Sequence, residues 1–192
     1  MLTREQLQRL SIKNQTSKIN IYREYCQHLF LSLLYGLRDA DQILFKGGTA
    51  LRVAYQSPRY SEDLDFTLFN ISDPKLEDKI LAISDGLEKT NLDNKIIEAK
   101  PTTGGYLAKL VVKLYGEEVT ISIQASRRKK NHRQPNVQLI NNDFIPSYTA
   151  LLLPETDLIT EKIQAALTRA KSRDFFDVYF LLRHGKVPLK LR

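Results

Sequence analysis

The sequence lacks the features that would assign it to several special classes of protein. It contains one cysteine, Cys26, so neither an internal disulfide framework nor a cysteine-based zinc site can form. No apolar run approaches the roughly 18–20 residues that are needed to span a bilayer. The amphipathic start lacks the apolar core of a signal peptide. We therefore expect a protein of a reducing, cytoplasmic compartment.

The composition is otherwise that of an ordinary globular chain. Of the 192 residues, 42% are hydrophobic and 27% are charged, which excludes disordered, collagenous and coiled-coil chains. This length suits one large domain, or one domain with a small helical appendage. Lysine and arginine (29) outnumber aspartate and glutamate (22), giving a formal net charge of +7. Such a basic surface favours polyanions as partners, and nucleic acid is the usual one.

Apolar spacing predicts helices and strands along the whole chain. Spacings of three and four predict helices over residues 2–14, 17–37, 49–55, 74–90, 155–170 and 174–182. Strand patterns fall at residues 42–45, 63–69, 95–99, 105–114 and 119–124. Tyr115-Gly116-Glu117 predicts a hairpin turn between the last two strands. The stretch SRRKKNHR (126–133) reads as a basic loop that either binds phosphate or is merely solvated.

Two short motifs point to phosphate chemistry. Gly47-Gly48 stands between a predicted strand and a predicted helix, whose N-terminus offers unpaired N–H groups to phosphates. Asp63 and Asp65 share one face of a predicted strand, where two carboxylates repel each other unless they hold a cation such as Mg²⁺. Each motif alone has an ordinary alternative, a plain turn or a solvated strand edge. Together, in this order, they predict metal-assisted nucleotidyl transfer.

Two strings in the sequence resemble the AbiEii nucleotidyltransferase toxins. That family belongs to the DNA polymerase β-like nucleotidyltransferase superfamily and includes the MenT toxins of bacterial toxin–antitoxin systems. The first string is KGGTALR (46–52) with RYSEDLDF (59–66), and the second is EKIQAALTR (161–169) with RDFFD (173–177). The resemblance covers roughly residues 45–182, and the middle strands match only in pattern.

The resemblance implies roles for individual residues. Asp63 and Asp65 would ligate Mg²⁺, and they would act in catalysis together with Lys162 and Asp174, for which Asp177 is an alternative. Ser61 matches a serine that antitoxins phosphorylate in some relatives. The residues implied to bind the nucleotide are Gly47, Gly48, Thr49, Arg52, Ser61 and Lys162. Without the resemblance, a helix carrying Lys162 is more often a solvated face, and the two C-terminal acids could simply pair with neighbouring basic residues.

The sequence departs from the family pattern in two places. The superfamily often has a third carboxylate on a later central strand, where this chain offers Gln124 or Ser122. Asp63 and Asp65 can still hold a metal, but this departure predicts a weakened second metal site or altered activity. Many relatives also continue beyond the second string into a longer helical region. Substrate contacts from such a region could be missing here or come from a partner.

These observations and the resemblance lead to one expectation. We predict an α/β (α+β) nucleotidyltransferase fold, a small mixed β-sheet flanked by helices, with a nucleotidyltransferase domain (1–145) and a C-terminal helical part (146–192) packed on it. The expected toxin transfers a nucleoside monophosphate from CTP or another NTP to the 3′ end of tRNA, or to another RNA, using Mg²⁺, and so blocks translation. Its expected partner is a cognate antitoxin, and no membrane is involved.

Two alternatives stay open. The enzyme could act on a protein or small-molecule hydroxyl instead of RNA. The chain could also be an RNA- or antitoxin-binding module whose catalytic centre has decayed, which the missing third acid would favour. Intact Gly47, Gly48, Asp63 and Asp65 argue against decay, because nothing structural requires that acid pair.

Overall fold

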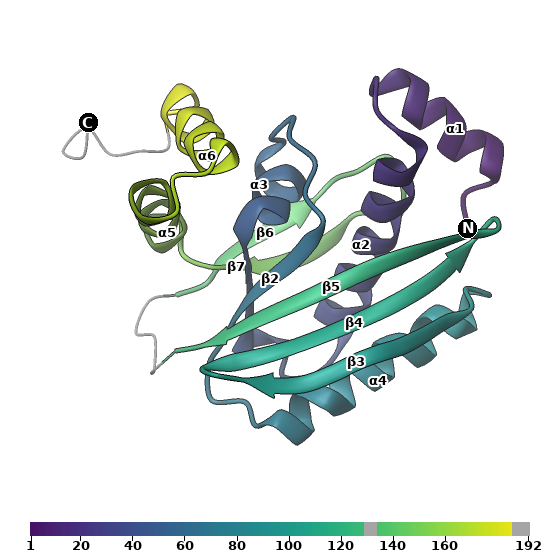
Figure 1. Cartoon of the computed structure of the whole chain (residues 1–192). Coiled ribbons are helices and arrows are strands. Elements are labelled where there is room, and N and C mark those ends of the chain that lie inside the picture. Colours follow the sequence, from purple (N-terminus) through teal and green to yellow (C-terminus); the bar gives the residue numbers. More distant parts are fainter. Residues whose placement is uncertain (129–133, 186–192) are drawn as a thin grey trace.

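The computed structural model describes residues 1–128 and 134–185, in which seven strands form one mixed sheet (Figure 1). The strands are β1 (Ile43–Lys46), β2 (Asp63–Leu68), β3 (Asn94–Thr102), β4 (Gly105–Leu114), β5 (Glu117–Arg127), β6 (Asn136–Ile140) and β7 (Tyr148–Leu152). Their order across the sheet is β3-β4-β5-β2-β1-β7-β6. β2 runs parallel to β5 and β1 runs parallel to β7, whereas the other neighbouring pairs are antiparallel.

In the described ranges, six α-helices accompany the sheet. They are α1 (Arg4–Lys13), α2 (Lys18–Gly36), α3 (Gly47–Tyr55), α4 (Asp73–Lys89), α5 (Glu155–Thr168) and α6 (Ser172–Arg183), and a short 3₁₀ helix, η1 (Ala40–Gln42), precedes β1. This mixed architecture confirms the predicted α/β fold class. Within the described ranges no helix is long and apolar enough to cross a membrane.

The main core lies between the sheet and the two long helices α2 and α4. The Phe30 ring of α2 packs at a tilt against Phe66 of β2, and the Phe66 ring also contacts Phe45 of β1. Because side chains alternate along a strand, burial of Leu64 and Phe66 on this face directs Asp63 and Asp65 to the opposite face. The acid pair therefore lies on the side of the sheet that α2 and α4 leave uncovered.

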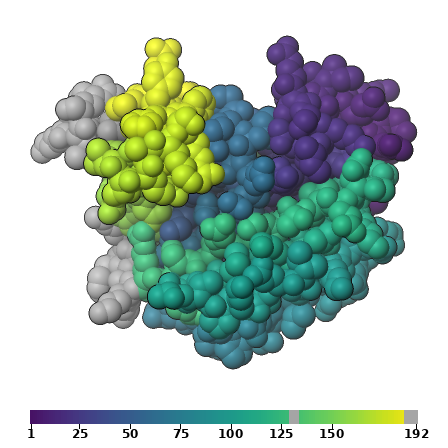
Figure 2. All heavy atoms as spheres, viewed as in Figure 1, coloured from purple at the N-terminus to yellow at the C-terminus, as the bar shows by residue number. Residues whose placement is uncertain are grey.

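The C-terminal helices stand over α3 on that uncovered side. A small apolar cluster joins them to α3 through Leu51, Leu158, Ile159 and Leu181, all buried. Figure 2 shows the yellow-green surface of α5 and α6 beside the blue surface around α3, with the teal strands below them. The side chains of both helices can therefore reach the glycine turn at the start of α3.

The structure differs from the sequence prediction mainly around residues 126–152. β5 extends to Arg127, so Ser126 and Arg127 belong to a strand rather than to a loop. β6 and β7 were not predicted, and β7, which follows the predicted domain boundary at residue 145, pairs with β1. These strands are only five residues long, too short for a clear periodic pattern. Residues 129–133 of the predicted basic loop lie outside the described residues.

Candidate active site

The glycine turn and the acid pair are in direct contact. Gly47 has a φ of +83°, a conformation that glycine adopts without steric cost. A Cβ atom at Gly47 would collide with the Asp65 carboxylate, because Oδ2 of that residue lies against the turn. Glycine is therefore required here both for the backbone conformation and for the close approach of Asp65.

The N-terminus of α3 has no side-chain cap from the described residues. Lys46 occupies the cap position, and its side chain makes no capping hydrogen bond. The first N–H groups of a helix point outward and carry the positive end of the helix dipole, so this end of α3 can accept an anion. The neighbouring carboxylate of Asp65 makes a bare anion unfavourable and a cation-bound phosphate favourable.

Asp63 and Asp65 lie side by side on β2, as predicted. The Thr49 hydroxyl donates a hydrogen bond to the backbone carbonyl of Asp63, which ties α3 to the start of the strand. Burial raises the pKa of Asp65, as does the Asp63 charge, while Lys162, Lys46 and Arg169 oppose this rise. Within the described residues no side chain donates a hydrogen bond to either carboxylate, so this negative charge is only partly balanced.

This donor set fits Mg²⁺. Two carboxylates without hydrogen-bond donors are typical ligands for a hard cation, and Mg²⁺ commonly uses one or two carboxylates together with substrate phosphates. No group of three or more His, Cys, Asp or Glu side chains that could hold a metal occurs in the part of the chain that the structure describes. As the sequence predicts, β5 offers no third carboxylate here, because Ser122 and Gln124 are the residues that lie opposite Asp63 and Asp65.

Lys46 flanks the acid pair from β1. It lies opposite Asp65 in the β1–β2 pairing, and its ammonium donates to the Ser126 hydroxyl at 2.8 Å. The same ammonium lies 3.3 Å from a carboxylate oxygen of Glu161, which also pairs with Arg128. Burial, the Arg128 charge and the Lys162 charge lower the pKa of Lys46 to about 8, against the opposing effect of Asp65.

A pocket of about 400 Å³ opens beside Asp65, on the β5 side of the acid pair. Its lining residues are Lys46, Asp65, Phe66, Thr102, Tyr106, Leu107, Gln124, Ala125 and Ser126. The pocket therefore combines one carboxylate and one ammonium with neutral polar and apolar groups. It offers room for a substrate group next to the predicted metal ligands.

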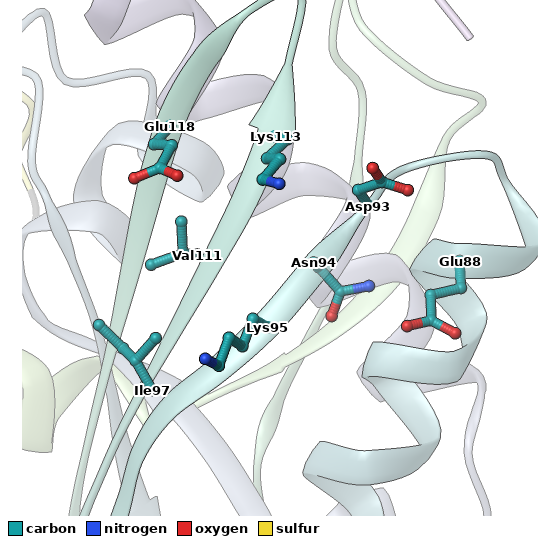
Figure 3. A pocket seen from close by; sticks show the side chains of 8 residues that line it. All are labelled: Glu88, Asp93, Asn94, Lys95, Ile97, Val111, Lys113 and Glu118. Carbon is teal, nitrogen blue, oxygen red and sulfur yellow. The ribbon is translucent and has the colours of Figure 1, made fainter.

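The larger hollow in Figure 3 lies elsewhere, where β3 and β4 meet the end of α4. It measures about 600 Å³ and is lined by Glu88, Asp93, Asn94, Lys95, Ile97, Val111, Lys113 and Glu118. Its acidic and basic side chains are mixed, and it contains none of the predicted site residues. Size alone therefore does not mark the candidate active site.

On the other side of the acid pair, Asp177 binds two cations. The Arg59 guanidinium donates to both carboxylate oxygens of Asp177 at 2.9 Å, and the Lys162 ammonium donates to Oδ2 at 2.7 Å. The Asp177 side chain is only 2% exposed, against 23% for Arg59 and 10% for Lys162. Lys162 of α5 is thus bound to Asp177 of α6, and its charge is near enough to Asp65 to lower the pKa of that carboxyl.

Asp174 has a different environment from Asp177. Its carboxylate pairs with Arg169 at 2.7 Å and accepts a hydrogen bond of 3.4 Å from the backbone N–H of Lys171, at the start of α6. Those are the contacts of a residue that caps a helix. Of the two alternatives left open by the sequence, Asp177 is therefore the acid that directly contacts Lys162.

Arg52 of α3 and Ser61 of the segment that joins α3 to β2 have different surroundings. The Arg52 guanidinium pairs with Glu24 at 2.7 Å, donates to the Ser57 carbonyl and stacks on the Tyr60 ring. Its contacts therefore tie the segment to α2 and α3, and none of them is with the acid pair. The Ser61 hydroxyl lies close to the glycine turn, 2.9 Å from where a Cβ of Gly48 would be.

Lys46 and Arg59 were not predicted as site residues, although both stand in the strings that carry the resemblance. The pattern gave no sign that Arg59 meets Asp177, because 118 positions separate them. In the basic segment, Arg127 pairs with Asp73 and Arg128 pairs with Glu161.

Comparisons with known proteins point to a single family. The sequence matches the family described as "Nucleotidyl transferase AbiEii toxin, Type IV TA system" over residues 32–192. No curated protein matches the sequence. The fold is similar to that of MenT4, a nucleotidyltransferase toxin from Mycobacterium tuberculosis, with a TM-score of 0.70 and 19% identity over 92% of this chain and 63% of MenT4. It is also similar to JHP933 from Helicobacter pylori, with a TM-score of 0.63 and 23% identity over 91% of this chain and 72% of JHP933.

These structural similarities show a shared fold. The chain spans less than two thirds of the length of MenT4. The sequence match, in contrast, covers well over half of the chain and includes both strings and every residue of the acid pair, the glycine turn and the Asp177 cluster.

Proposed function

The chain belongs to the AbiEii family of nucleotidyltransferase toxins, and we propose that it transfers a nucleoside monophosphate from an NTP to a hydroxyl group in a Mg²⁺-dependent reaction. The observation that carries this proposal is the contact between the Gly47 turn and the Asp65 carboxylate. That contact places an unpaired pair of metal-binding carboxylates beside a helix N-terminus that can accept phosphate.

In the proposed reaction one bond to the α-phosphorus forms and one breaks. The acceptor hydroxyl oxygen forms a bond to the α-phosphorus, the bond from that phosphorus to the bridging oxygen breaks, and pyrophosphate leaves with the bonding electrons. The hydroxyl proton passes to solvent. Mg²⁺ held by Asp63 and Asp65 would polarise the α-phosphate and orient the hydroxyl.

We assign the remaining site residues from their contacts. The backbone of Gly47 and Gly48, the Ser61 hydroxyl and the Lys162 ammonium face the nucleotide. Thr49 positions Asp63 through its hydrogen bond to that residue's carbonyl.

Two further residues support the site without facing the nucleotide. Arg52 positions the segment before β2 through its contacts with Glu24 and Tyr60. Asp174 caps α6, and Asp177 is the acid of the site. Within the proposed C-terminal part (146–192), the helices α5 and α6 bring Lys162 and Asp177 to the proposed nucleotidyltransferase domain (1–145).

RNA is the acceptor that the charge of the chain favours. The net charge of +7 suits a polyanion, and we propose the 3′ end of tRNA, because the resemblance to MenT toxins implies it. The basic stretch 126–133 would contribute phosphate contacts. Neutralising residues 127–130 should then weaken RNA binding and flatten its dependence on salt. An unchanged slope would exclude this stretch from the RNA-binding surface.

The biological setting follows from the family. We propose that the chain acts in the cytoplasm as the toxin of a toxin–antitoxin pair, where blocked tRNA would stop translation. Its cognate antitoxin would be the protein partner.

A second candidate rests on the missing third acid. With Gln124 and Ser122 opposite the acid pair, the chain could bind RNA or an antitoxin without catalysing transfer. A third candidate keeps the chemistry and replaces RNA by a protein or small-molecule hydroxyl.

One experiment separates these candidates. Pure protein is incubated with Mg²⁺, each α-labelled NTP in turn and total tRNA. We expect label on tRNA, and we expect it to be lost in the double variant Asp63→Asn/Asp65→Asn. The control variant Asp78→Asn/Asp85→Asn removes the same two charges from exposed positions of α4 and should stay active. Label on protein alone would favour the other acceptor, and no label on any acceptor would favour the binding module.

A further inference from the structure

We propose that Arg59 and Lys162 together form the site for the two terminal phosphates of the nucleotide, and that Asp177 is a positioning residue that holds both cations. The identity of the ligand rests on the proposed function. The existence of an anion site rests on the contacts alone, so the two can be tested separately.

Hydrogen bonds fix the Arg59 guanidinium in place and leave some of its N–H groups without an acceptor among the described residues. Its Nε and Nη2 atoms donate to Asp177, and Nη1 donates to the Tyr60 carbonyl at 3.3 Å. A guanidinium has five N–H groups, so these bonds leave two without an acceptor among the described residues. Asp177 occupies the parallel N–H groups on Nε and Nη2 and so fixes the orientation of the guanidinium. One N–H group on Nη1 and one on Nη2 remain as donors for a phosphate.

One of the two spare N–H groups of Arg59, on Nη2, lies at the glycine turn. Nη2 of Arg59 is so close to Gly48 that a Cβ atom there would collide with it. The guanidinium therefore lies directly over the start of α3, where the helix N–H groups also favour an anion. Phosphate bound at this point would meet the guanidinium and the helix terminus together.

Lys162 extends the site toward the acid pair. Its ammonium is bound to Asp177, and of all the cations its charge has the largest effect on the pKa of Asp65. Asp65, the proposed metal ligand, lies against Gly47, and the Arg59 guanidinium lies against the next residue, Gly48. Lys162 shares Asp177 with Arg59, so the two cations and the metal position lie in one neighbourhood. A nucleotide with its α-phosphate at Asp65 would then present its β- and γ-phosphates to Lys162 and Arg59.

The order of burial distinguishes this site from a structural tie between α6 and the segment before β2. Asp177 is the most buried member of the cluster and the two cations are the more exposed members. Solvent therefore reaches the two positive groups, while the carboxylate is almost fully covered. The net charge of the three groups is positive, which suits a pyrophosphate leaving group that gains negative charge as the bond to the α-phosphorus breaks.

The test compares ligands that differ only in their terminal phosphates. Binding of magnesium pyrophosphate, of each NTP and of the matching NMP is measured by calorimetry for the wild type and for Arg59→Gln, Arg59→Lys and Asp177→Asn. Arg23→Gln is the matched control, because it removes a similarly buried arginine whose partner is Glu62 in the same segment. Thermal unfolding without ligand checks that each variant is folded.

We expect Arg59→Gln to weaken pyrophosphate and NTP binding by about tenfold or more, while NMP binding stays within twofold. Arg59→Lys keeps the positive charge without the guanidinium geometry, so its affinity for pyrophosphate and NTP should lie between those of the wild type and Arg59→Gln. Asp177→Asn makes the cluster more positive, so it distinguishes simple charge attraction from positioning of the two cations. Simple charge attraction then predicts tighter binding of pyrophosphate, whereas loss of positioning predicts weaker binding, which is the result we expect.

Three results would overturn the proposal. These are unchanged pyrophosphate and NTP binding in folded Arg59→Lys and Arg59→Gln, tighter pyrophosphate binding in Asp177→Asn, and failure of the wild type to bind pyrophosphate or any NTP. A different result would contradict the proposed function. A protein that binds pyrophosphate through Arg59 and transfers no label keeps the anion site and loses the enzymatic activity.

Discussion

Gln124 lies directly opposite Asp65 in the parallel pairing of β2 and β5, so its side chain shares a sheet face with the acid pair. Glutamate has nearly the same shape, and Gln124→Glu should therefore supply a third carboxylate without disturbing the packing. We expect the variant to need several-fold less Mg²⁺ for half-maximal nucleotidyl transfer, because an added carboxylate strengthens the binding of a hard cation.

The control for this variant is Thr120→Glu, which adds the same charge to an exposed position further along the same face of β5. Its Mg²⁺ requirement should equal that of the wild type. An unchanged requirement in Gln124→Glu would show that position 124 does not face the metal.

Gly47→Ala should abolish transfer even where the protein still folds. Alanine at this position has to adopt a positive φ, which costs about 1–2 kcal/mol, and its Cβ collides with the Asp65 carboxylate. Gly104→Ala is the matched control, since Gly104 has a similar φ of +88° and nothing within 4 Å of the added Cβ.

Both glycine variants should lose stability in urea unfolding, and Gly47→Ala should lose more. Activity should survive only in Gly104→Ala. Equal activity in the two variants would mean that the contact between residue 47 and Asp65 is not needed for the reaction.

The local parts of this site could be predicted from the sequence and the long-range parts could not. Gly47 and Asp65 stand in short motifs whose chemistry follows from spacing alone, and the strand that carries Asp65 alternates clearly. Asp177 and Arg59 meet only because Leu51 packs on α5 and α6. No local pattern encodes that contact.

β6 and β7 could not be predicted for a similar physical reason. The long helices have enough turns to show their period, whereas β7 has five residues and pairs with β1 through a single register pair, Phe45 with Leu152. Its place in the sheet depends on residues about a hundred positions away. A strand of this kind is visible only once the sheet is assembled.

Asp65→Asn should raise stability while it removes activity. Burial raises the pKa of Asp65 in the folded protein above its ordinary value of 3.8, so the folded state holds this proton more tightly than the unfolded chain. The free energy of unfolding therefore falls as pH rises from 3.8 through the raised pKa of the folded protein, and ionised Asp65 destabilises the protein at pH 7. In EDTA, the variant should melt higher than the wild type at pH 7, and the gap should close below about pH 4.

Adding Mg²⁺ provides the complementary measurement for Asp65. The cation should raise the melting temperature of the wild type and leave that of Asp65→Asn unchanged, since binding to the folded state alone stabilises it. Asp85→Asn, at an exposed position of α4, should respond to Mg²⁺ as the wild type does. A wild type that does not respond to Mg²⁺ would contradict the metal assignment.

His28 should make the protein sensitive to mild acid. The imidazole is 3% exposed, its Nδ1 lies 2.9 Å from the Tyr148 hydroxyl, and its ring contacts Phe144. Burial and the Arg52 charge lower its pKa from the ordinary 6.5 to about 4. Between these two values the unfolded chain binds the proton and the folded protein does not, so the free energy of unfolding falls as pH drops from 6.5 to 4.

The loss attributable to His28 is about 3 kcal/mol, because a tenfold change in proton affinity is worth about 1.4 kcal/mol. Urea unfolding at several pH values from 4 to 7 measures it. His28→Gln should flatten this part of the profile, whereas Phe144→Leu should lower stability at every pH and keep the slope, since it disturbs the same ring cluster without removing a titrating group. If His28→Gln and the wild type lose the same stability over this range, His28 is protonated in the folded protein as readily as in the unfolded chain.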